Sequence, residues 1–239
     1  MIYNENLMIK ETNISLTTDL KDHNLNDYLL SIRGDLIEYI NYNSLFLSSL
    51  KPLNNISYDV KPIIRLMNDA SNIANVGPMA SVAGAISEVS CNYLINLGSH
   101  YSIVNNGGDI SLINNKKVTC GIFSENDYLK NSFGFKLKTR KTPIGICTSS
   151  SKTGLSLSFG ESESVTVVSK KASYADSLAT SIANHVKGFE NEEAIQNALE
   201  IAENFKEYFD GVLIIKEGNV GTLGKLPKIV STKPFDIDY

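Results

Sequence analysis

Hydrophobic and polar residues alternate with a period of two through the middle of the chain, and this pattern predicts a block of β-strands. Gly, Asn and Ser clusters separate the segments, as is typical of strands joined by tight turns. The segments predicted to form strands are residues 8–18, 101–113 (two strands around a turn), 116–123, 133–138, 144–151, 154–159, 163–169 and 209–230 (a strand, a turn and a short strand).

Helical spacing of apolar residues appears on both sides of this block. Pro62 near the start of one segment, and Gly77 with Pro78 at the start of another, favour helix starts there. Gly34 marks a point where the first helix can be interrupted, and residues 41–53 read as irregular. The predicted helices are residues 25–40, 61–74, 76–98, 173–186 and 191–205.

The stretch "VNNGGDI", residues 104–110, is the strongest turn signal in the chain. Strands joined by hairpins and grouped between helices indicate an α+β fold with antiparallel β-sheets, because a parallel sheet would show regular β-α-β alternation. No repeat and no low-complexity linker interrupts the chain. We therefore expect one domain over residues 1–239.

Composition excludes several classes of protein. The chain has 239 residues, of which 42% are hydrophobic, and a formal net charge of -4. Its basic runs are short, which argues against nucleic acid as a partner. No apolar stretch approaches the ~20 residues of a membrane helix, and no signal peptide is evident, so we expect a cytoplasmic protein that does not enter a membrane. Cys91, Cys120 and Cys147 lack zinc or disulfide spacing and are expected to be buried thiols.

Residues 174–184, "YADSLATSIAN", carry the densest chemical signal. A spacing of four places Asp176 and Thr180 one turn apart on the same side of the predicted helix, while Ala175, Leu178, Ala179 and Ile182 form an apolar stripe. One interpretation is that Asp176 caps its own helix and Thr180 bonds back to a carbonyl. The other is that both oxygens point toward a cation or a phosphate.

The predicted helix over residues 76–98 begins with a run of small residues that includes Gly77, Ala80, Ala83 and Gly84. Small side chains allow close approach, either of another helix or of a ligand held against the backbone. A helix N-terminus also offers free N–H groups to an anion. Both explanations stay open at this point.

Several further polar groups have two interpretations. Ser149, Ser150, Ser156 and Ser158 flank Gly154 and are either ordinary sheet and turn serines or donors to a phosphate or a ribose. A serine nucleophile is not favoured, because no histidine is close in sequence. Glu88, Asn106 and Asp109 are either turn and surface residues or groups that line a pocket.

Four segments in this order and spacing resemble one known family: "VGPMASVAGAISE" (76–88), "VNNGGDI" (104–110), "SSSKTGLSLSFGESESVTVV" (149–168) and "YADSLATSIAN" (174–184). The sequence resembles the ApbE-like family, the short relatives of the FAD:protein FMN transferases, over about residues 30 to 186. The resemblance implies an α+β architecture related to the tunnelling fold, with antiparallel sheets covered by helices on one side.

The resemblance also implies roles for single residues. The transferases use an Ala-Asp-x-x-Ala-Thr segment to hold a Mg²⁺ ion that engages the FAD pyrophosphate, and Asp176 and Thr180 occupy the matching positions. A Gly-Gly-Asp turn of the transferases forms part of the flavin pocket and matches Gly107, Gly108 and Asp109. These matches imply Mg²⁺ and FAD or FMN as cofactors.

Other matches are partial. Gly84 and Glu88 fit the small-residue helix of the transferases, but Ala83 stands where those enzymes carry a lysine. Thr153 and Gly154 are kept from the His-x-x-x-Pro-x-Thr-Gly segment, whereas its histidine and proline are absent. The N-terminal Phe-Asp-x-Thr segment of the transferases has no match.

Three functions follow as hypotheses. The first is an enzyme that cleaves or transfers a group at a flavin-like pyrophosphate with Mg²⁺. The second is a flavin- or nucleotide-binding protein that has lost the transfer groups, and the third is a subunit that binds a protein partner. Gly77, Gly84, Glu88, Asn106, Ser150 and Gly154 join the turn residues as candidate ligand contacts. Close packing of small-residue helices makes a homodimer a candidate assembly.

Overall fold

The computed structural model describes residues 1–54, 56–57, 59–122, 132–150 and 160–233. Every strand pairing within this part of the chain is antiparallel. The large sheet has the order β1-β2-β3-β4-β7-β8-β9-β10, and a small sheet has the order β11-β6-β5. The strands are β1 (Tyr3–Ile9), β2 (Thr12–Thr18), β3 (Ser102–Asn106), β4 (Asp109–Ile113), β5 (Val118–Gly121), β6 (Phe133–Leu137), β7 (Ile144–Ser149), β8 (Ser164–Ser169), β9 (Gly211–Lys216), β10 (Asn219–Gly224) and β11 (Lys228–Ser231).

The helices agree closely with the helical periodicity. They are α1 (Leu25–Tyr42), α2 (Leu45–Ser48), α3 (Pro62–Ala74), the 3₁₀ turn η1 (Pro78–Ser81), α4 (Val82–Asn96), α5 (Ala172–Ala183) and α6 (Asn191–Glu203). Two expectations were wrong. Gly34 does not interrupt α1, and the stretch expected to be irregular contains α2. The predicted helix over residues 76–98 is divided, because Pro78 opens a 3₁₀ turn before α4 begins.

The N-terminal strand was predicted wrongly as one element over residues 8–18. The structure has a hairpin instead, in which β1 pairs with β2. The chain reverses at Lys10, which has a left-handed φ of 51°. Lysine rarely adopts this conformation, so the usual Gly or Asn signal for such a turn is missing from the sequence.

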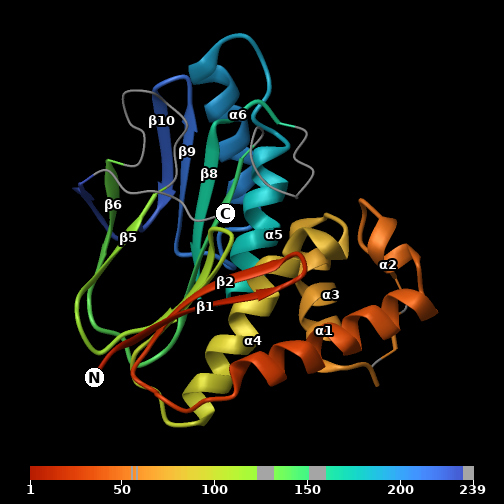
Figure 1. The fold of residues 1–239 in the computed structure, drawn as a ribbon. Coiled ribbons are helices and arrows are strands. Elements are labelled where there is room, and N and C mark those ends of the chain that lie inside the picture. Colours follow the sequence, from red (N-terminus) through yellow and green to blue (C-terminus); the bar gives the residue numbers. More distant parts are fainter. Residues whose placement is uncertain (55, 58, 123–131, 151–159, 234–239) are drawn as a thin grey trace.

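Three layers build the molecule (Figure 1). Helices α4, α5 and α6 pack on one face of the large sheet, α3 lies against α4 and α5, and the small sheet packs on the other face. Alternation along β7 separates the two faces: Cys147 joins the cluster under α5, whereas Ile144 and Ile146 join the cluster between the sheets. The α+β class with antiparallel sheets is confirmed.

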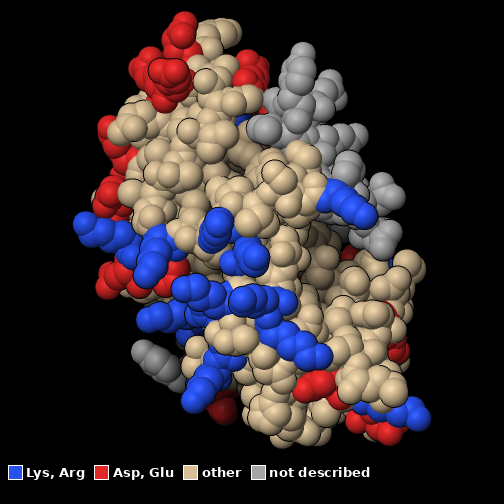
Figure 2. Space-filling model, turned by 90° about the vertical axis from the view of Figure 1, so that its left-hand side faces the viewer, with Lys and Arg blue, Asp and Glu red and all other residues tan. Residues whose placement is uncertain are grey.

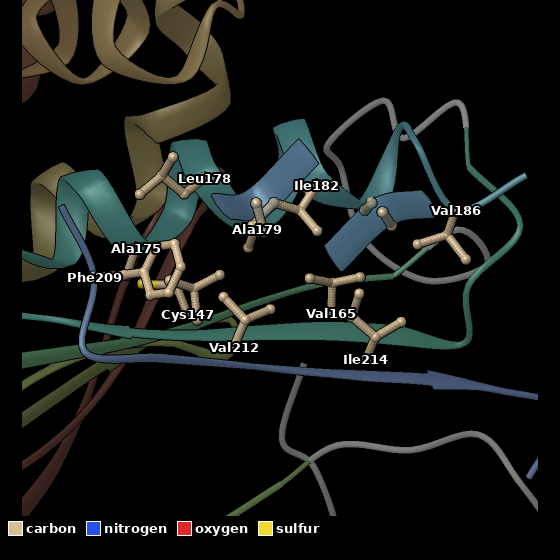
Figure 3. Close-up of a cluster of buried hydrophobic side chains, with 14 of the residues drawn as sticks. Cys147, Val165, Ala175, Leu178, Ala179, Ile182, Val186, Phe209, Val212 and Ile214 are labelled. Carbon is tan, nitrogen blue, oxygen red and sulfur yellow. The ribbon is translucent and has the colours of Figure 1, made fainter. Parts of the chain in front are cut away.

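The apolar stripe predicted on residues 174–184 forms the core under α5. Ala175, Leu178, Ala179 and Ile182 are fully buried. Figure 3 shows them above the strands, facing the side chains of Cys147, Val165, Val212 and Ile214. This packing fixes α5 on the sheet and leaves its other side for Asp176 and Thr180. Among the described residues, no helix is both long and apolar enough to cross a membrane.

Candidate functional site

Helices α4 and α5 cross in close contact at Gly84. A Cβ atom added there would lie 2.5 Å from the carbonyl oxygen of Ala172 and 2.6 Å from the Cβ of Asp176. Such distances are shorter than any normal contact, so only glycine fits. Close helix packing therefore accounts for this small residue of α4. Gly77 is similar, because its added Cβ would lie 1.8 Å from the carbonyl oxygen of Ser49.

At this crossing, each helix places a carboxylate at the N-terminal end of the other helix. The Gly84 N–H in the first turn of α4 donates to Oδ2 of Asp176 on α5 (2.8 Å). In return, the N–H and the hydroxyl of Ser173 in the first turn of α5 donate to Oε2 of Glu88 on α4 (2.9 and 2.8 Å). Each carboxylate satisfies a free N–H at the start of the other helix. The interpretation in which Asp176 caps its own helix is wrong, since Asp176 caps α4.

Asp109 is the second carboxyl group near Asp176. It lies on β4, where its Oδ1 accepts from the backbone N–H of Thr148 (3.3 Å). Burial raises the pKa of Asp109 to about 7. Burial, and then the charge of Asp109, raise the pKa of Asp176 well above its ordinary value. Because like charges repel, ionisation of both carboxyl groups is disfavoured, and a proton on one of them or a bound cation relieves the repulsion.

The Cys147 thiol on β7 lies near the carboxyl groups of Asp109 and Asp176. It donates to the carbonyl oxygen of Ala172 (3.3 Å). Burial and the charges of Asp109 and Asp176 raise its pKa well above the ordinary value, so the thiol stays protonated. The expectation of buried thiols is confirmed for all three cysteines. Sequence reasoning did not place Cys147 at the site, because nothing in its sequence neighbourhood links it to Asp176.

The Thr180 hydroxyl is buried and has no hydrogen-bond partner within the part of the chain that the structure describes. Its side chain lies one turn after Asp176, and the residue is only 4% exposed. The interpretation in which Thr180 bonds back to a carbonyl is therefore wrong. The buried hydroxyl of Ser149 at the end of β7 also has no partner among the described residues. A buried polar group without a partner costs free energy, so Thr180 and Ser149 are groups that a ligand could satisfy.

The hairpin between β3 and β4 is tied to the first turns of α4. Gly107 and Gly108 have φ values of 64° and 104°, as the predicted turn requires. The Asn106 side-chain amide donates to the carbonyl oxygen of Ala83 (3.4 Å), and the Ser87 hydroxyl donates to the carbonyl oxygen of Asp109 (2.7 Å). These bonds hold Asp109 beside the start of α4.

The structure brings together most of the residues singled out in the sequence. Asp176, Glu88 and Gly84 meet at the helix crossing, and Asn106 and Asp109 reach it from the hairpin. Ser150 is buried just after β7. Gly154, together with Thr153, Ser156 and Ser158, lies outside the described residues. Gly77 packs against the turn after α2. The binding roles of all these residues stay predictions.

Sequence reasoning missed Ser173 and Cys147 at this site, whereas Ser149 was among the serines singled out. Ser173 acts through a hydrogen bond to another helix, which no local pattern reveals. Within the described parts of the chain, no group of three or more His, Cys, Asp or Glu side chains could hold a metal ion. A metal ion here would depend on one or two carboxylates, a hydroxyl and oxygens of its ligand.

Comparison with known proteins adds the family. A family model described as AbpE bacteria matches residues 4–221. The UPF0280 protein of Methanobrevibacter smithii is 54% identical over 233 residues, covering 98% of each chain. The chain belongs to the UPF0280 family. The UPF0280 protein of Methanocaldococcus jannaschii is 42% identical over 236 residues, covering 97% of this chain and 95% of the relative.

Solved structures show the fold of this UPF0280 protein. Flavin transferase ApbE from Vibrio cholerae matches with a TM-score of 0.55 at 14% identity and covers 98% of both chains. The ApbE protein of Thermotoga maritima matches with a TM-score of 0.56 at 12% identity, covering 98% of this chain and 97% of that one. The resemblance to the ApbE-like family is confirmed, and the similarity at this identity shows a common fold.

Proposed function

We propose that this UPF0280 protein binds a phosphorylated nucleotide, with a flavin nucleotide as the first candidate, through a divalent cation held by Asp176 and Thr180. The single observation that carries the proposal is the buried Thr180 hydroxyl, which has no hydrogen-bond partner among the residues that the structure describes and lies one turn from a carboxyl group of raised pKa. Both features cost stability in the free protein, and a cation would relieve both.

The chemistry of these residues suits Mg²⁺. This ion prefers oxygen ligands and keeps several waters, so it needs few protein ligands. One oxygen of Asp176 accepts from the Gly84 N–H, which leaves the other oxygen for a cation. Asp109 provides the second negative charge. When bound, such a cation withdraws electrons from a phosphoanhydride oxygen.

The choice of a flavin nucleotide is supported by the sequence resemblance and by the shared fold. Flavin transferase ApbE from Vibrio cholerae shares the fold over 98% of both chains. The hairpin at Gly107 and Gly108, which matches their flavin-pocket turn, is tied directly to the crossing of α4 and α5 through Asn106 and Ser87.

A non-catalytic binding protein is the second candidate. Ala83, whose carbonyl oxygen accepts from Asn106, stands where the transferases carry a lysine. An alanine methyl group offers neither a charge nor a proton to a reacting phosphate. The missing lysine therefore bears on catalysis and not on binding. The proposal requires binding, and turnover is tested by a separate assay.

Binding is tested by thermal unfolding of the full chain with Mg²⁺ and FAD, FMN or ADP. At a free ligand concentration 100 times Kd, binding stabilises by about 2.7 kcal/mol, which raises Tm by roughly 5–10 °C. Thr180→Val removes only the hydroxyl and should abolish the increase. Thr180→Ser keeps the hydroxyl and should retain most of it.

The Asp176→Asn side chain can still accept a hydrogen bond from the Gly84 N–H, so this variant should fold. Its increase in Tm with nucleotide should no longer depend on Mg²⁺. A Thr180→Val protein that gains as much stability from Mg²⁺ and nucleotide as the wild type would refute the proposal. Chromatography of the incubated nucleotide then distinguishes the two candidates, because only the enzyme forms a product.

A further inference from the structure

The outer face of the small sheet is strongly basic. Described residues 114–121, 132–141 and 224–233 contain nine Lys or Arg residues and no Asp or Glu, although the whole chain has a net charge of -4. Figure 2 shows Lys and Arg side chains gathered on the side of the molecule that carries β5 and β6. The nine residues, called the basic face below, are Lys116, Lys117, Lys136, Lys138, Arg140, Lys141, Lys225, Lys228 and Lys233.

Two lysines of the basic face are directly opposite each other. Lys136 on β6 pairs in register with Lys228 on β11, so their side chains project from the same side of the sheet. Like charges in this arrangement destabilise a sheet. The next residue in the same row is Thr119 on β5, which provides no negative charge. The repulsion is therefore not offset within the row.

Protection of sheet edges does not explain this arrangement. Lysines on edge strands prevent sheets from pairing with other chains, and Lys228 on β11 has such a position. Lys136, however, lies on β6, the central strand of the small sheet. A lysine there adds repulsion without protecting an edge.

A buried amide holds part of the basic face in place. Asn114 is fully buried, and its side-chain nitrogen donates to the carbonyl oxygens of both Lys116 and Lys138 (2.6 and 2.9 Å). The backbone carbonyl oxygen of Asn114 accepts from the backbone N–H of Arg140 (2.8 Å). Three cationic residues from two segments are thereby fixed close together.

The cations of the basic face are available to a partner. Eight of the nine are exposed and Arg140 is partly buried. In the described parts of the chain, the ion pairs are formed by other residues: His23, Arg33, Lys61, Lys206 and Lys216.

We propose that the basic face binds an acidic segment of a partner protein. Lysine predominates over arginine, and lysine is a point charge that matches dispersed carboxylates without the planar geometry that suits phosphates. A strand of four or five residues is only about 13–17 Å long, so the face suits a short segment. A long nucleic acid would extend beyond it onto a chain that is acidic overall.

The outward side chains support the same choice. Nucleic-acid platforms combine cations with exposed aromatic rings on which bases stack. Phe135 is turned inward and fully buried between the sheets, and Phe133 packs against the same cluster. The outward positions of the described strands next to Lys136 and Lys228 hold Thr119, Gly134 and Val230.

This interaction is separate from nucleotide binding. The large sheet lies between the basic face and Asp176, because α5 packs on the opposite side of that sheet. Loss of one activity should therefore leave the other unchanged.

The test is fluorescence anisotropy with a labelled octaglutamate peptide and the full chain at low ionic strength. The double variant Lys136→Glu/Lys228→Glu should raise Kd by about tenfold or more. The control Lys21→Glu/Lys51→Glu has the same change in charge at exposed lysines outside the basic face and should change Kd less than about threefold, in line with the small effect of distant screened charges.

Stability provides a second measurement. The single variant Lys136→Glu replaces a repulsive pair with an attractive one and should raise Tm by roughly 1–3 °C while weakening peptide binding. Equal loss of binding in the control variant would overturn the proposal, as would a lower Tm with unchanged binding. Tighter binding of duplex DNA, single-stranded RNA or phosphatidylserine vesicles through the same two lysines would overturn the choice of partner.

Discussion

The two faces of the large sheet are buried in different ways. Between the two sheets the interior is apolar, with Phe135, Leu112 and Ile144 at its centre. On the helix face, an apolar core under α5 adjoins a crossing where buried carboxyl groups meet. Both faces belong to the same sheet, so the difference in how they are buried comes from the side chains that each face carries.

The comparison shows which buried groups are needed for folding alone. The sheet-to-sheet layer demonstrates that this chain can close a face with hydrophobic side chains. Burying carboxyl groups costs free energy that hydrogen bonds recover only in part. Glu88 is satisfied by two donors from Ser173, but Thr180 has none and Asp176 lies near a second carboxyl group. The Thr180 hydroxyl and the Asp176 carboxyl group are thus buried polar groups that a bound cation could stabilise, which supports the proposed binding site.

The largest expected effect tests the apolar face. Phe135→Ala empties the centre of the layer between the sheets, because Phe135 is fully buried. It should lower the free energy of unfolding by about 3–5 kcal/mol, measured by urea unfolding. The gain in stability from Mg²⁺ and nucleotide should stay the same. A loss of that gain would show that the two faces are coupled.

The next effect tests the helix crossing. Gly84→Ala places a methyl group 2.5 Å from the Ala172 carbonyl oxygen, and the helices must separate. We expect a loss of about 3 kcal/mol, together with weaker nucleotide binding, by urea unfolding and calorimetry.

Gly34→Ala in α1 is the matched control for this change. An added Cβ there meets nothing within 4 Å, so alanine should stabilise the helix by up to about 1 kcal/mol. Equal effects of the two substitutions would mean that the close approach at Gly84 does not matter.

The pH dependence of the helix face is a gradual effect that is spread over several pH units. The folded-state pKa of Asp109 is about 7 and that of Asp176 is also raised. Raised values contribute stability that is present below the unfolded pKa of about 4 and is lost as the pH rises toward 7. Each carboxyl group contributes a slope of at most about 1.4 kcal/mol per pH unit.

Urea unfolding from pH 4.5 to 7.5 measures this slope without added cation. Asp109→Asn should flatten it, and Mg²⁺ should oppose the fall at high pH. The lowered pKa values of Asp19 and Glu161 affect stability in a more acidic range, below about pH 4.5. A stability that rises from pH 5 to 7 would contradict the assignment of raised pKa values.

Much of the fold could be predicted because local patterns determine it. Pro62 marks the start of α3, and the glycines at 107 and 108 form the turn between β3 and β4. The errors occurred where local signals were weak. Lys10 makes a left-handed turn without Gly or Asn, so the hairpin of β1 and β2 was predicted as one strand.

The candidate site was predictable in part. The spacing of Asp176 and Thr180 identified one helix face, and the small residues of α4 indicated a close approach. No local pattern could reveal that Asp176 would accept from Gly84, or Glu88 from Ser173, since these partners are about 90 residues apart. Cys147 was missed for the same reason.

The sequence by itself determined the antiparallel α+β class, the position of most helices and the one-turn spacing of Asp176 and Thr180, because these depend on the periodicity and turn chemistry of neighbouring residues. Only the tertiary structure decided that α4 and α5 cap each other with carboxylates. It also decided that burial and the charge of Asp109 raise the pKa of Asp176, and that Lys136 lies opposite Lys228. These features depend on distances between segments remote in sequence, where burial and charge act through space.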